Sequence, residues 1–130
     1  MTDQTLAPSS SGTILVIDDE PIVLQTAKMA LERRGYRVLT AENGREGVEL
    51  FAALPGEISL VILDMTMPVM GGVEALTALH AADPRVRVLG SSGYSEQEAL
   101  QQFGSGLAAF LQKPYTVRKL YECVADALDR

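Results

Sequence analysis

Polar side chains follow four of the five short apolar runs in this sequence, where they could take part in chemistry. They are Asp18, Asp19 and Glu20 after residues 14–17, Asp64 after residues 59–63, Ser91 and Ser92 after residues 86–89, and Lys113 after residues 107–111. A single Asp after an apolar run is typical of a helix cap or a turn. Three carboxylates brought together would repel one another, so a divalent cation or a cationic side chain must neutralise them. Mg²⁺ would supply the first and Lys113 the second.

The elements that must position these residues alternate along the chain. Runs rich in Val, Ile and Leu predict strands at residues 14–17, 36–40, 59–63, 86–89 and 107–111. Helical spacing of apolar residues predicts helices at residues 21–34, 44–54, 72–82, 95–103 and 117–128. This alternation favours an α/β fold of the (βα)5 type, a doubly wound five-stranded parallel sheet with helices on both faces. In such sheets, functional residues gather at the carboxyl ends of the strands.

Composition limits the classes of function that the chain can serve. Its 130 residues are 47% hydrophobic and 22% charged, the balance of a globular domain. The net charge of -6 and the lack of any basic run argue against direct binding of nucleic acid. No apolar run approaches the roughly 20 residues of a membrane helix, so we expect no membrane contact. The single Cys123 favours a reducing, cytoplasmic location.

The polar start of the chain differs in composition from the rest. Residues 1–12 are rich in Ser and contain Pro and Gly, and they lack the charged and apolar regions of a signal peptide. They predict a flexible tail or linker. Residues 13–130 then form the domain.

Four motifs occur in order along that domain. They are ILVIDDEP at 14–21, LVILDMTMPVMGG at 60–72, VLGSSGY at 88–94 and FLQKPY at 110–115. Together they resemble the receiver domain of two-component response regulators, especially the kind found in hybrid sensor histidine kinases. The resemblance runs from Ile14 to Leu128 and implies a flavodoxin-like sheet with strand order 2-1-3-4-5.

The resemblance implies that the carboxylates form a phosphoryl-accepting metal site. Asp64 would be the phosphoacceptor, and Asp19 and Asp64 would ligate Mg²⁺. The backbone carbonyl of Thr66 would be a further ligand, and Asp18 would act through water. A carboxylate is already ionised at neutral pH, so Asp64 needs no general base to attack phosphorus.

It also implies a set of residues that bind the phosphoryl group and transmit the change. Lys113 would pair with Asp64 before the transfer and with the phosphoryl oxygens after it. The peptide bond between Lys113 and Pro114 would be cis. Ser92 would bond the phosphoryl group, with its neighbour Ser91 as the alternative because the register of this strand is open by one residue. Phe110 would be the aromatic switch residue, and it acts by packing because it has no hydroxyl.

A receiver domain implies a partner that carries the phosphoryl group on histidine. This partner would be a sensor histidine kinase or a histidine phosphotransfer domain, and kinase domains could be attached in a longer chain. The single His80 lies on the predicted helix at 72–82, away from the acids. We therefore expect it to be a surface or packing residue, and the domain to be regulatory rather than an enzyme.

Two other classes of protein share part of this pattern. A magnesium-dependent phosphohydrolase with an aspartyl nucleophile would carry a second acid two residues after it, where this chain has Thr66. A flavodoxin-like binding module would need a Ser/Thr/Gly-rich turn after the first strand, where this chain has Asp18, Asp19 and Glu20. Metal titration with and without a phosphoryl analogue would separate the three classes.

Overall fold

A single five-stranded sheet organises the computed structural model, which describes residues 12–67, 70–103 and 106–129. Its strands are β1 (Thr13–Ile17), β2 (Arg37–Ala41), β3 (Leu60–Asp64), β4 (Val88–Ser92) and β5 (Ala109–Gln112). Its helices are α1 (Pro21–Arg33), α2 (Gly44–Ala53), α3 (Gly72–Ala82), α4 (Glu96–Phe103) and α5 (Val117–Leu128). All neighbouring strands are parallel, in the order β2-β1-β3-β4-β5. The predicted (βα)5 fold and its strand order are confirmed.

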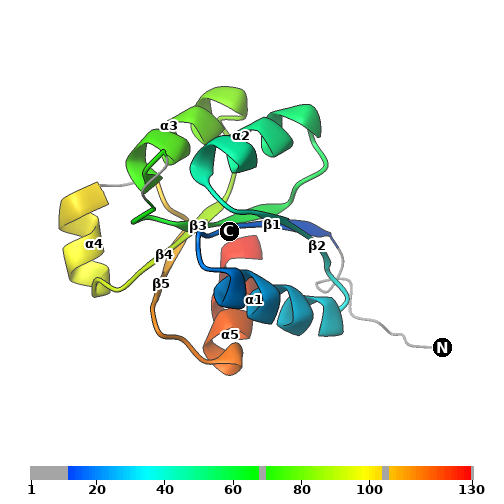
Figure 1. Cartoon of the computed structure of the whole chain (residues 1–130), viewed down its shortest axis with the longest axis vertical. Helices are drawn as coiled ribbons and strands as arrows, with labels where there is room; N and C mark the ends of the chain where they lie inside the picture. The colour runs from blue at the N-terminus through cyan, green and yellow to red at the C-terminus, as the bar shows by residue number, and fades with distance from the viewer. Residues whose placement is uncertain (1–11, 68–69, 104–105, 130) are drawn as a thin grey trace.

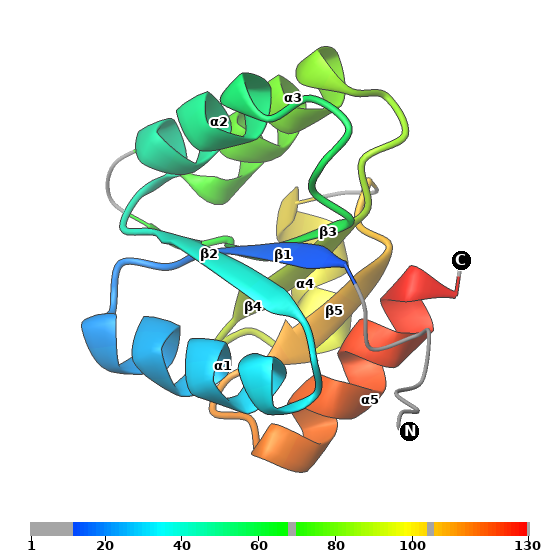
Figure 2. The same ribbon diagram turned by 90° about the vertical axis from the view of Figure 1, so that its right-hand side faces the viewer.

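Helices cover both faces of this sheet, as Figures 1 and 2 show. Helices α2 and α3 lie on one face, α1 and α5 lie on the other, and α4 lies beyond β4 and β5. Alternate residues of the strands face the two sides. Ile14, Val16, Leu60 and Ile62 belong to the core on the α1 and α5 side, whereas Leu15, Ile17, Val61 and Leu63 belong to the core under α2 and α3.

The last three strands end later than the apolar runs predict. Strand β3 includes Asp64, and β4 includes both Ser91 and Ser92. Backbone pairing explains the extension, because the carbonyls of Ser91 and Ser92 accept hydrogen bonds from Met65 and Lys113 at 2.8 and 2.7 Å. The two serines therefore lie within the sheet rather than in the loop after it.

At the opposite end of the sheet, pairing with β2 begins one residue before β1. Gly12 accepts a hydrogen bond from the Arg37 amide at 2.9 Å, so it already takes part in pairing with β2. Residues 1–11 of the predicted tail lie outside the described residues.

Among the side chains that the structure describes, helix α4 has fewer buried than any other helix. Of its described side chains only Ala99 is buried, and Leu100 is 63% exposed. Its first turn is closed by a reciprocal pair, in which Ser95 Oγ accepts from the Glu98 amide and Glu98 Oε1 accepts from the Ser95 amide. Within the described ranges, no helix has the length and apolar character needed to cross a membrane.

Candidate functional site

Parallel pairing of β1 with β3 brings the carboxylates of both strands to one edge. Ile17 pairs with Leu63, so Asp18 and Asp64 follow at the same level. The amide of Asp18 continues the sheet by donating to the Ala41 carbonyl at 3.1 Å, which holds this residue in place. Both carboxylates are buried, each 2% exposed.

Glycine at position 72 lets the next helix approach this edge closely. A Cβ at Gly72 would lie 2.4 Å from Cα of Met65, the residue after Asp64. Any larger residue would therefore push α3 away from the loop that follows Asp64. The position of this loop depends on the absence of a side chain there.

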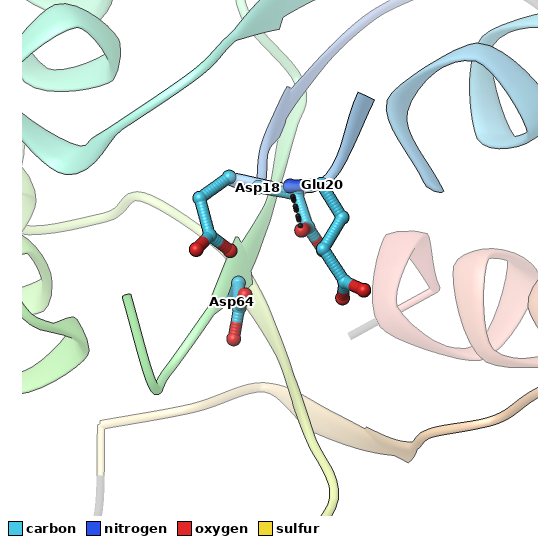
Figure 3. Close-up of side chains that lie close together, drawn as sticks. Asp18, Glu20 and Asp64 are labelled. Carbon is cyan, nitrogen blue, oxygen red and sulfur yellow. Dashed lines mark hydrogen bonds between the residues drawn. The ribbon is translucent and has the colours of Figure 1, made fainter. Parts of the chain in front are cut away.

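Four carboxylates converge at the edge. One oxygen from each of Asp18, Asp19, Glu20 and Asp64 lies within 4.8 Å of the others. Figure 3 shows Asp18, Glu20 and Asp64 side by side, with the Glu20 amide donating to Asp18 Oδ1 at 2.9 Å. Hard cations such as Mg²⁺ take several oxygen ligands, so the chemistry of these donors fits the expected ion.

Lys113, directly after β5, places one positive charge against this cluster. Its Nζ lies 2.8 Å from Asp18 Oδ2, 3.0 Å from Glu20 Oε1 and 3.3 Å from Asp64 Oδ2. The nearest carboxylate is therefore that of Asp18 rather than that of Asp64. The peptide bond from Lys113 to Pro114 is cis, as expected.

Thr66 orients the carboxylate of Asp64. Both its amide and its hydroxyl donate to Asp64 Oδ1, each at 3.0 Å. One oxygen of Asp64 is thus held by two donors, while the other faces Lys113. The sequence resemblance assigns only the backbone carbonyl of Thr66 a role, so this use of its hydroxyl is an addition.

Burial and neighbouring charges shift the pKa values of several groups at this edge. Burial raises the pKa of Asp18, and the Lys113 bond opposes this only in part. Burial and the neighbouring Asp64 raise the pKa of Asp19. Burial alone would lower the pKa of Lys113, but its bonds with Asp18 and Glu20 outweigh this and raise it. The excess of negative charge is therefore only partly compensated by Lys113, which leaves the cluster suited to a cation.

The two serines of β4 occupy different places relative to Asp64. Ser91 is the residue paired with Asp64 across the sheet, and both serines are buried. Ser92 Oγ accepts a hydrogen bond from the Tyr94 amide at 3.1 Å, within its own turn. Ser92 Oγ only accepts in this bond, so the hydroxyl hydrogen can still donate to another acceptor.

Two further residues named from the sequence lie apart from the acids. Phe110 is half-buried on β5, where it pairs with Gly90 of β4. His80 lies near the end of α3, with Nε2 3.0 Å from the Gly106 carbonyl oxygen. His80 therefore has a packing contact between segments and lies outside the acidic edge, as predicted.

An apolar cleft lies beside the acids and was not predicted from the sequence. Its volume is about 390 Å³, and its lining residues are Glu20, Ile22, Val23, Thr26, Lys113, Pro114 and Tyr115. Ile22 is 77% exposed at the start of α1, an unusual place for a large aliphatic side chain. Burial raises the pKa of Tyr115 to about 12, so its phenol stays neutral at physiological pH. The helical spacing of apolar residues does not predict this cleft, because Ile22 lies outside the buried face of α1.

Comparison with known proteins agrees with this geometry. Residues 14–125 match the model of the response regulator receiver domain. The sensor kinase CckA of Brucella abortus is 32% identical over 123 residues, which cover 94% of this chain but only 13% of that kinase. The chain thus spans a small part of this relative.

Solved structures show the same fold. A response regulator receiver domain protein from Clostridium thermocellum superposes with a TM-score of 0.82 at 33% identity, covering 92% of this chain and 95% of that one. The receiver domain of the hybrid histidine kinase CckA superposes with a TM-score of 0.77 at 32% identity, covering 90% and 99%. On these matches and this fold, the chain belongs to the response regulator receiver domain family.

Proposed function

We propose that Asp64 is the residue that accepts the phosphoryl group in this regulatory domain. The observation that carries the proposal is the convergence of Asp64 with Asp18, Asp19 and Lys113 at one edge of the sheet. An oxygen of Asp64 attacks the phosphorus of a phosphohistidine, the phosphorus–nitrogen bond breaks, and the imidazole leaves with the electron pair. A carboxylate attacks as an anion, so the barrier lies in charge repulsion rather than in the removal of a proton.

The residues at the edge divide this work between them. Asp19 and Asp64, with the Thr66 carbonyl, would hold Mg²⁺, and Asp18 would contact it through water. When bound, the ion supplies positive charge at the phosphoryl oxygens. Lys113 supplies a second positive charge, and the two bonds from Thr66 hold Asp64 in one orientation.

One residue on β4 and one residue on β5 would respond to the new charge on Asp64. The hydroxyl of Ser92, whose oxygen accepts from the Tyr94 amide, would donate to a phosphoryl oxygen, a charge-assisted bond. Phe110, half-buried beside Gly90, would then repack on the α4 side of the sheet.

The donor would be a sensor histidine kinase or a histidine phosphotransfer domain. The cleft of Ile22 and Tyr115 beside Lys113 supports this, because it offers an apolar surface next to the acceptor. Kinase domains attached in a longer chain are consistent with the named kinase relative, of which this chain matches 13%. Because such kinases draw on ATP, we place the reaction in the cytoplasm.

The test is phosphorylation by acetyl phosphate, followed by intact mass. The parent chain should gain one phosphoryl group when Mg²⁺ is present and none when it is chelated. Asp64→Asn should gain none, whereas Asp83→Asn, which alters a carboxylate at the far end of α3, should behave as the parent.

Two results would contradict the proposal. Equal labelling of Asp64→Asn would place the acceptor elsewhere. Steady release of phosphate over many turnovers, without accumulation of the labelled chain, would favour the phosphohydrolase class instead.

A further inference from the structure

Helix α3 contacts the segment before β5 through His80, a residue that has no part in the proposed reaction. Nε2 of His80 lies 3.0 Å from the carbonyl oxygen of Gly106. A carbonyl only accepts hydrogen bonds, so the ring donates from Nε2 in either its neutral or its charged form. The backbone of Gly106 lies directly on α3, because a Cβ there would be 3.4 Å from Leu76 and 3.7 Å from His80 Nε2.

The next residue, Leu107, packs into a gap in β4. Gly90 has no side chain, and a Cβ built there would lie 2.7 Å from Leu107 Cδ1 and 3.1 Å from Cδ2. Leu107 therefore occupies the space that a larger residue at position 90 would fill. It joins the core under α2 and α3, which includes Leu76 and Leu79 of α3 and Val88 of β4.

These contacts reach the part of β4 that carries the proposed switch hydroxyl. Ser92 lies two residues after Gly90, and side chains two apart in a strand face the same side. The side of β4 on which Leu107 rests is thus the side toward which Ser92 points. A shift of this strand end would have to move Leu107 or slide beneath it.

We propose that His80 and Leu107 form a latch, which sets how readily the end of β4 shifts when Asp64 is modified. This inference rests on the proposed role of Asp64. The latch contacts and the bond from the Tyr94 amide to Ser92 Oγ both occur before Asp64 is modified, so the latch holds the end of β4 in this unshifted arrangement. Loosening the latch favours the shifted arrangement, and a ligand that binds that arrangement then binds more tightly.

The probe is beryllofluoride, a phosphoryl mimic, titrated at saturating Mg²⁺ and followed by amide NMR at Tyr94 and α4. His80→Ala removes the bond to Gly106. Because a neutral hydrogen bond of ordinary strength is lost, His80→Ala should bind beryllofluoride about two- to tenfold more tightly than the parent chain. His80→Gln places an amide nitrogen at a similar reach and should restore the parent affinity.

A second variant tests the other half of the latch without touching His80. Gly90→Ala adds a methyl group that pushes Leu107 off β4, and it should tighten binding in the same direction. The matched control is Thr77→Ala on the same helix, since Thr77 Oγ1 bonds the Val73 carbonyl of α3 itself. Thr77→Ala also loses one side-chain hydrogen bond, but that bond lies within α3 and does not join the helix to another segment.

The outcomes separate the latch from the proposed function. If the parent fails to bind beryllofluoride at Asp64, the function proposed for Asp64 fails and the latch fails with it. If the parent binds but His80→Ala and Gly90→Ala match Thr77→Ala, or bind more weakly, the latch alone is overturned. Tighter binding by both, with parent affinity in His80→Gln, supports it.

Discussion

Lys113 is the residue whose removal should disturb the acidic edge most when no metal is present. Its Nζ lies 2.8 Å from Asp18 and 3.3 Å from Asp64, and both carboxylate side chains are only 3% exposed. Lys113→Ala would leave these two charges buried without a cationic partner. We therefore expect the variant to be less stable than the parent chain.

The expected loss follows from the burial of the pairs. Removing one partner of a buried ion pair costs about 3–5 kcal/mol. The side chain of Lys113 is 17% exposed, and its third partner, Glu20, is 60% exposed, so solvent screens part of the effect. We take the lower end, about 3 kcal/mol. With about 2.1 cal/mol/K of unfolding entropy per residue, a chain of 130 residues should lose about 11 °C in Tm.

The measurement is urea unfolding followed by circular dichroism, first with a chelator and then with Mg²⁺. Because Mg²⁺ would neutralise the same oxygens, it should reduce the deficit of the variant. Lys28→Ala is the matched control, since Lys28 pairs with Glu32 at 3.3 Å on an exposed face, with side chains 45% and 48% exposed. Its loss should stay below about 0.5 kcal/mol.

A single result would refute the reasoning about charge at this edge. If Lys113→Ala and Lys28→Ala unfold at the same urea concentration in chelator, Lys113 does not compensate Asp18 and Asp64 energetically. Replacing Asp18 as well, in Lys113→Ala/Asp18→Asn, should recover part of the loss, because it removes the closest uncompensated charge.

Three further predictions concern pH, orientation and the tail. The pKa values of Asp18 and Asp19 are raised in the folded chain, so the stability these groups contribute is present at low pH and is lost as the pH rises through the raised values. Metal-free Asp19→Asn should thus be more stable than the parent at pH 7, by about 0.5–1 kcal/mol, and this difference should disappear once the pH falls below the ordinary pKa of an aspartate, about 3.9; a difference that does not change with pH would contradict this. Thr66→Val removes one of two bonds to Asp64 and should slow labelling by acetyl phosphate about two- to tenfold, as intact mass against time would show. An unchanged rate would mean that the amide alone suffices. Deletion of residues 2–11 should leave Tm and labelling unchanged, and a loss of several degrees would mean that this segment packs on the domain.

The sequence alone was sufficient for the architecture and for the position of the charged residues. Unbroken apolar runs such as residues 14–17 specify strands buried on both faces, and their alternation with amphipathic stretches leaves few topologies. Parallel strands deliver whatever follows them to the same edge. Asp18, Asp64 and Lys113 therefore meet because of topology, which needs no knowledge of side-chain rotamers.

Side-chain direction at the edge could not be predicted in this way. Glu20 contacts Lys113 and Thr66 contacts Asp64 through rotamers that depend on the local turn, and neither residue type is distinctive there. The ends of β3 and β4 were also set by pairing with neighbours rather than by their own residues. Ser91 and Ser92 have weak strand propensity, yet their carbonyls complete bonds with Met65 and Lys113.

The small number of buried side chains described in α4 has a consequence for local unfolding of the domain. Among the side chains described in α4, at residues 96–102, only Ala99 is buried, so these side chains add little packing against the rest of the fold. The helix depends instead on local features such as the reciprocal bonds between Ser95 and Glu98. Its amides should therefore exchange with solvent deuterium through local unfolding, well before those of β1 and β3, which exchange only when the whole domain unfolds. Local unfolding of α4 would then open the region nearest to the proposed switch while the sheet stays folded.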